Sequence, residues 1–186
     1  MTPTFGLGND RHDYGNGFYL TDDIELAKEW AVCKPNEKNG WVHTYTLHIN
    51  NLNIFFQKVD ILILMKHRNA SDSKRYKMIA TKFISKYDVD ISHYDVIRGW
   101  RANALYFYIA KEFVRDNVDI AILEELLSLG GLGMQYCIKS KLSYDNLFEV
   151  KEELHSIEYY KFNNKYNRRD IKARKIMKKN DRFRQK

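Results

Sequence analysis

The sequence predicts an α+β fold, because strand-like and helix-like segments follow one another without strict alternation. A short aromatic strand at 18–20 leads directly into a helix that begins at Ile24. Helical patterns then separate the early strands from later strands at 94–97 and 134–138. A doubly wound parallel sheet would instead need one helix after each strand.

The turn before the first strand contains Gly15 and Gly17, which we expect to adopt positive φ and to bring the backbone close to a ligand. Phe18, Tyr19 and Leu20 alternate as a half-buried strand does. One of the two aromatic rings is therefore expected to face a cleft.

Thr21 or Asp22 is the expected cap of the following helix. Trp30 lies beside the predicted apolar face of this helix, which consists of Ile24, Ala27 and Ala31. A tyrosine on the strand and a tryptophan on the helix can stack on a planar ring such as nicotinamide. From spacing alone, packing in a core explains these aromatic residues better.

The rest of the chain gives the remaining elements. Residues 40–49 alternate as a strand, and 52–56 are expected to pair with them across an Asn-rich turn. Residues 58–87 have a helical pattern with a break at 71–73. The later elements are a strand at 94–97, helices at 105–114 and 120–129, a strand at 134–138 and a possible edge strand at 147–150.

Charge divides the chain into two parts, a predicted domain at 1–150 and a basic tail at 151–186 that is helical or disordered. The whole chain carries a net charge of +7, yet residues 161–186 contain twelve lysines and arginines against Asp170 and Asp181. Such a tail favours nucleic acid, or another acidic partner, by electrostatic attraction. A solubilising role explains the same charge equally well.

No apolar run reaches the roughly 20 residues that span a bilayer, and no secretory signal is recognisable, so we expect a cytoplasmic protein that does not insert into a membrane. Cys33 and Cys137 are expected to be reduced core residues. Their spacing matches no metal site, and none is predicted.

Three ordered blocks resemble a known family. They are 15–19 (Gly-Asn-Gly-Phe-Tyr), 94–103 (Tyr-Asp-Val-Ile-Arg-Gly-Trp-Arg-Ala-Asn) and 133–140 (Gly-Met-Gln-Tyr-Cys-Ile-Lys-Ser). The chain is identified by them as a member of a bacterial domain family of unknown function (DUF3990), which is similar to the diphtheria-toxin and poly(ADP-ribose) polymerase branch of ADP-ribosyltransferases. The resemblance implies a split β-sandwich with helical insertions.

The resemblance also implies a use for each matching residue, with NAD as substrate. Tyr19 would stack on nicotinamide, Trp30 would close the other side, and Gln135 would occupy the position of the catalytic glutamate. The implied cofactor-binding residues are Gly17, Phe18, Tyr19, Trp30, Arg101 and Asn103. Arg101 and Asn103 would contact pyrophosphate or the acceptor, although a surface arginine and a turn asparagine also need no ligand.

The chain departs from the transferase pattern at two points. Related proteins begin with a His-Gly strand that holds the nicotinamide ribose, and no histidine here precedes a glycine. Either the natural start lies upstream of Met1, or the group has been lost. Gln135 is also uncharged, so it cannot supply the electrostatic stabilisation that a glutamate gives to developing positive charge.

Two functions therefore remain open at the level of sequence. The first is a mono-ADP-ribosyltransferase, such as a bacterial toxin or effector, that modifies a protein or nucleic-acid acceptor. The second is a catalytically inactive relative that binds nucleic acid or an acidic partner through residues 161–186.

Overall fold

We describe the fold from a computed structural model of the 186-residue chain. The described residues are 1–10, 12–32, 39–55, 90–101, 104–115, 117–118, 125–126, 133–156, 168, 171 and 175. The helices expected at 58–87 lie outside them, as does most of the helix expected at 120–129. Within the described residues, no helix is long and apolar enough to cross a membrane.

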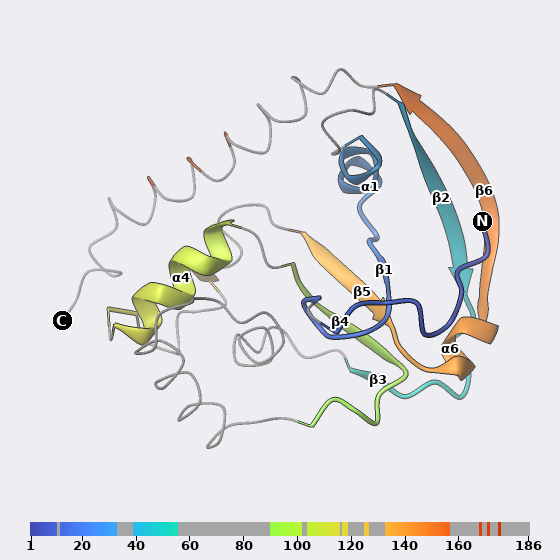
Figure 1. Ribbon diagram of the computed structural model, residues 1–186, viewed down its shortest axis with the longest axis horizontal. Helices are drawn as coiled ribbons and strands as arrows, with labels where there is room; N and C mark the ends of the chain where they lie inside the picture. Colours follow the sequence, from blue (N-terminus) through green and yellow to red (C-terminus); the bar gives the residue numbers. More distant parts are fainter. Residues whose placement is uncertain are drawn as a thin grey trace.

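The described elements form two sheets, so the α+β class is confirmed (Figure 1). One sheet has four strands in the order β1-β5-β4-β3, and the other has two, β2 and β6. β5 pairs antiparallel with both of its neighbours, and β3 pairs parallel with β4. The strands are β1 (Phe18–Leu20), β2 (Asn39–Leu47), β3 (Ile54–Phe55), β4 (Val96–Trp100), β5 (Met134–Ile138) and β6 (Leu147–Ser156).

The expected pairing of 52–56 with the strand at 40–49 is wrong. β2 pairs along its whole length with β6, and β3 belongs to the other sheet beside β4. Two hydrogen bonds hold this crossing, from the Asn53 amide to Asp95 Oδ2 at 2.7 Å and from the Asp95 amide to the Asn53 carbonyl at 2.8 Å. Asn51, with φ of 68°, turns the chain just before them.

The two sheets pack against each other around a hydrophobic core. Val96, Ile138 and Leu147 are buried at its centre. Because side chains alternate along a strand, β1 contributes Phe18 and Leu20 to this core and directs Tyr19 to the opposite face. The other residues packed on this core are Tyr45, Leu47, Leu52, Ile54, Tyr136 and Tyr144.

Helix α1 (Ile24–Ala31) follows β1 as expected, but its cap and its buried face differ from the prediction. Asp23, rather than Thr21 or Asp22, accepts the amides of residues 25 and 26. Thr21 instead donates to the Met134 carbonyl at 3.0 Å, which ties the end of β1 to β5.

The face of α1 that is buried contains Leu26 and Glu29, whereas Ile24 is 49% exposed. α1 packs on β2, where Gly40 lies so close that a Cβ there would be 1.9 Å from the Ala31 carbonyl oxygen. Leu26 instead packs near Gly133, where a Cβ would be 2.7 Å from its Cδ2, and sequence periodicity did not indicate this buried side.

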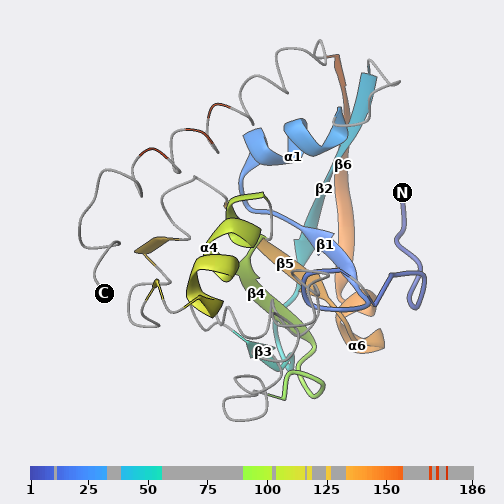
Figure 2. The ribbon, with the colours of Figure 1, turned by 60° about the vertical axis from the view of Figure 1, so that its left-hand side comes forward.

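Two further helices have described bounds. α4 (Ala104–Val114) confirms the helix expected at 105–114, and Figures 1 and 2 place it on the side of the four-stranded sheet away from β2 and β6. Its buried residues include Tyr106, Ile109 and Ala110. The short α6 (Lys141–Asp145) joins β5 to β6 and begins with a capping box between Ser140 and Ser143.

Tyr14 packs over β4 at Gly99, which gives a stability prediction. A Cβ at Gly99 would lie 2.1 Å from the Tyr14 hydroxyl oxygen, and this hydroxyl donates to the Trp100 carbonyl at 2.6 Å. We expect Gly99→Ala to lower the free energy of unfolding by about 1–3 kcal/mol, because the ring must move. Urea denaturation measures the loss.

The control is the same substitution in a Tyr14→Ala background, where the clashing ring is gone. Gly99→Ala should then cost much less, so the two changes are not additive. Additive losses would show that the contact between Tyr14 and Gly99 does not cause the destabilisation.

Candidate functional site

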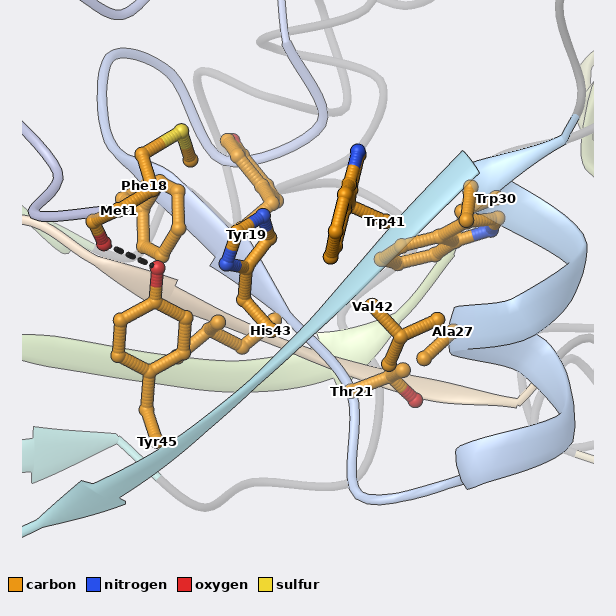
Figure 3. Close-up of a pocket in the computed structure, with 12 residues that line it drawn as sticks. Met1, Phe18, Tyr19, Thr21, Ala27, Trp30, Trp41, Val42, His43 and Tyr45 are labelled. Carbon is orange, nitrogen blue, oxygen red and sulfur yellow. Dashed lines mark hydrogen bonds between the residues drawn. The ribbon is translucent and has the colours of Figure 1, made fainter. Parts of the chain in front are cut away.

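A pocket of about 260 Å³ lies where β1, α1 and β2 meet (Figure 3). It is open on one side and contains both aromatic and polar groups. Its lining consists of Met1, Phe18, Tyr19, Leu20, Thr21, Ala27, Trp30, Ala31, Trp41, Val42, His43 and Tyr45. Of the residues expected to bind a cofactor, Phe18, Tyr19 and Trp30 are in this set.

Three large aromatic side chains reach the pocket from three different elements. Tyr19 comes from β1, Trp30 from α1 and Trp41 from β2, and the indole of Trp41 stands between the other two in Figure 3. Trp41 is 54% exposed, which is unusual for a tryptophan outside a binding surface. The sequence interpretation treated Trp41 only as a strand residue and did not assign it to a site.

Tyr19 is held by its hydroxyl group. The hydroxyl donates to the Gly15 carbonyl at 2.8 Å and accepts from the Tyr14 amide at 2.8 Å. Burial raises the pKa of Tyr19 well above its ordinary value, so the phenol stays protonated at neutral pH. Tyr19 is therefore a fixed ring rather than an acid or base.

Gln135 lies on the same face of the sheet as Tyr19. Tyr19 pairs with Cys137 on β5, and Gln135 is two residues from Cys137, so all three side chains leave the sheet in one direction. Gln135 is only 3% exposed and does not line the pocket. The structure thus brings Tyr19 and Gln135 to one face but only Tyr19 to the cavity.

The amide of Gln135 is engaged with a buried carboxylate. Its Nε2 donates to Asp13 Oδ2 at 2.7 Å and to the Trp100 carbonyl at 3.3 Å. Asp13 is 7% exposed, so this hydrogen bond lies in a largely dry environment. Sequence reasoning missed this pair, because 122 residues separate its members and no local pattern links them.

Gly17 and Phe18 act in the structure through packing. Positive φ was expected at both Gly15 and Gly17. Gly15 has it, with φ of 84°, but Gly17 does not. Gly17 is needed because a Cβ would lie 2.4 Å from the sulfur of Cys137. The Phe18 ring packs edge-on against Tyr45, with centroids 5.6 Å apart.

Arg101 does not line the pocket, but it contacts Trp30, which does. Its guanidinium group is 5.1 Å from the centre of a Trp30 ring, a cation–π geometry that places positive charge beside the aromatic wall. Asn103, the other residue expected to contact pyrophosphate, lies outside the described residues.

A polar cluster on the opposite face of the sheet was not anticipated. Arg98 donates through Nε to the Tyr136 hydroxyl at 2.8 Å, and that hydroxyl donates to Asp22 Oδ2 at 2.9 Å. Arg98 and Tyr136 face each other in the register of β4 and β5. Only knowledge of this strand pairing could have predicted the cluster.

Comparison with known proteins gives one match. The profile of a family described as "Protein of unknown function (DUF3990)" matches residues 1–149, which include every described strand up to the start of β6. No curated protein and no solved structure matches the chain.

The pair of Asp13 and Gln135 predicts a pH-dependent effect on stability. Gln135→Glu would place two carboxylates in contact, so one of them should keep its proton and have a raised pKa in the folded state. Stability should be close to wild type in acid and fall, by roughly 1–3 kcal/mol, as the pH rises through that pKa. Urea denaturation at several pH values measures it.

The matched control exchanges the two groups. Asp13→Asn combined with Gln135→Glu restores one amide and one carboxylate, and most of the stability at pH 8 should return. If the double variant is as unstable as the single one, the two side chains are not paired.

A second prediction concerns Cys137, whose burial raises the pKa of its thiol to about 11. At pH 8 roughly 0.1% of this thiol is ionised, against about 10% at an ordinary pKa near 9. In a Cys33→Ser background, we expect iodoacetamide to alkylate the native protein at least about 100-fold more slowly than the urea-unfolded chain. Equal rates in both states would contradict a buried Cys137.

Proposed function

The chain belongs to the DUF3990 family, and we propose that it is a mono-ADP-ribosyltransferase-like protein that uses NAD as substrate to modify a macromolecule. The acceptor would be a protein or a nucleic acid, in keeping with a toxin or effector role.

The pocket lined by Tyr19, Trp30 and Trp41 is the observation that carries the proposal. Aromatic walls suit a planar ring such as nicotinamide, since offset stacking contributes about 0.5–1.5 kcal/mol beyond burial. The volume of about 260 Å³ is below the roughly 300–1,000 Å³ typical of sites that enclose a drug-sized ligand. The pocket therefore suits one ring with its sugar, while the rest of a dinucleotide would extend outward.

Arg101 supports a binding mode in which the nicotinamide ring enters the pocket and the rest of NAD extends outward. Its guanidinium group lies against Trp30, and such groups recognise phosphate oxygens through paired hydrogen bonds. A nicotinamide between the aromatic rings would leave its pyrophosphate on the side of Arg101.

The reaction would break the bond between ribose C1′ and the nicotinamide nitrogen, with the electron pair leaving on nicotinamide. The acceptor then bonds to C1′ and loses a proton. Positive charge develops on the ribose, and a nearby carboxylate stabilises it. Gln135 has no charge, but Asp13 places a carboxylate 2.7 Å from its amide. Neither residue lines the pocket, so Asp13, our candidate for the missing negative charge, would act on the ribose from outside it.

A second candidate function is the inactive binding module, and the buried position of Gln135 favours it. Its amide is satisfied by Asp13 and the Trp100 carbonyl, and it does not reach the pocket. Binding would then depend on the basic segment 161–186, of which the described residues Arg168, Ile171 and Lys175 are exposed. Nucleic acid is the partner that this charge suits best.

Binding of NAD, followed by tryptophan fluorescence, tests the pocket. Trp41→Ala should weaken binding roughly two- to twelvefold, which corresponds to the loss of one stacking contact. Trp41→Phe keeps an aromatic ring and should retain most of the affinity. Equal affinity in wild type and Trp41→Ala would remove the pocket as the nicotinamide site.

Transfer itself is tested with labelled NAD and a cell lysate. Wild-type protein should label a macromolecule, and both Tyr19→Ala and Asp13→Asn should abolish labelling while the folded state is verified by circular dichroism. No transfer, together with salt-sensitive binding of nucleic acid that is lost when residues 161–186 are deleted, would favour the binding module instead.

A further inference from the structure

Three potential metal ligands meet on one face of the two-stranded sheet. They are His43 on β2 and Glu149 and Glu152 on β6. One ligand atom from each lies within 4.8 Å of the others. His43 also lines the pocket (Figure 3).

A β-bulge creates this arrangement. His43 lies opposite Glu152 and Tyr45 lies opposite Glu149, which leaves Val150 as an extra residue in β6. On a regular strand, residues three apart project from opposite faces. The bulge therefore turns Glu149 and Glu152 to the same face, the one that carries His43, as bulges often do beside functional sites.

The bulge offers no gain in packing that would explain it. Val150 is 60% exposed, so the extra residue adds an apolar side chain to the surface rather than to the core. What the irregularity achieves is the meeting of one imidazole and two carboxylates.

The distances suit a small cation. His43 Nδ1 lies 2.5 Å from Glu149 Oε1 and 3.7 Å from Glu152 Oε2. Ligand bonds of about 2.0–2.2 Å to a central ion would set these separations near 3–3.5 Å, so small side-chain rotations are enough. The Met1 amino group binds the other oxygen of Glu149, Oε2, and leaves Oε1 directed at His43.

We propose that His43, Glu149 and Glu152 bind a divalent transition-metal ion of the zinc class. One nitrogen and two oxygen ligands match the donors that zinc takes, whereas magnesium prefers oxygen ligands alone. Three protein ligands leave at least one coordination position for water or a ligand from the pocket. The site uses neither Gln135 nor Asp13, so zinc binding can be measured without NAD.

The test is calorimetric titration of the purified chain with Zn²⁺ and, separately, with Mg²⁺. We expect one Zn²⁺ per chain and much weaker binding of Mg²⁺. His43→Ala and Glu152→Gln should each reduce the zinc affinity at least about tenfold, because each removes a direct ligand. Glu152 is exposed but His43 is partly buried, so thermal unfolding without metal verifies that both variants fold.

The matched controls are His48→Ala and Glu153→Gln. His48 is an exposed histidine just beyond β2, and Glu153 projects from the other face of β6, where it pairs with Lys151. Neither control should change zinc binding. The proposal fails if His48→Ala weakens binding as much as His43→Ala, or if no Zn²⁺ binds to the wild type.

Deletion of Val150 tests whether strand register brings the ligands together. Without Val150, Glu149 and Glu152 are two residues apart and project from the same face of a regular strand, so the folded deletion variant should still bind zinc, and loss of binding would overturn the assignment. If that variant is unfolded, anomalous scattering at the zinc edge from wild-type crystals decides the question. An ion elsewhere than between these three side chains would overturn the assignment.

Discussion

The position of β5 between β1 and β4 is the constraint on which the other described features depend. Its antiparallel pairing on both sides sets which residues face which layer. One face of β5 contributes Tyr136 and Ile138 to the packing between the sheets. The other face places Gln135 and Cys137 beneath residues that precede β1. If β1 shifted by one residue along β5, its two faces would be exchanged. Tyr19 and Gln135 would then project from opposite faces of the sheet.

The turn before β1 serves as a cover for that second face. Asp13 and Tyr14 are buried there, and their contacts extend to Gln135 and to the Trp100 carbonyl. The aromatic pocket, in contrast, lies at the edge of β1, where the sheet meets α1 and β2. The chain therefore has a dry polar network and an open aromatic cavity as neighbours, and Tyr19 belongs to both.

Local sequence patterns predicted the elements well, because β1, β2, β5 and α4 each have a complete signal within a few residues. The same local patterns did not predict which strands pair.

β3 joins β4 rather than β2, since the Asn53 and Asp95 contacts form across 42 residues. β6 was expected only at 147–150, because charged residues continue the strand to Ser156 and hide its period. The cap fell on Asp23 among three adjacent polar candidates, a choice that depends on local geometry. The His43 group was missed because strand register brings it together, and Asp13 was missed because the turn before β1 folds back onto β5. Trp41 was missed because its pocket forms only where three elements meet.

The contact between Gly17 and β5 has a consequence for how this sequence can evolve. A Cβ at position 17 would lie 2.4 Å from the Cys137 sulfur and also 2.7 Å from the Ile138 carbonyl oxygen. Replacing Cys137 with a smaller residue would remove the first obstacle, but the second belongs to the main chain and is present whatever residue occupies 138. No compensating substitution on β5 can therefore open position 17 to another amino acid. Descendants of this protein that keep the β1–β5 pairing must keep this glycine, while the fully buried Cys137 can be replaced only by a side chain of similar or smaller size.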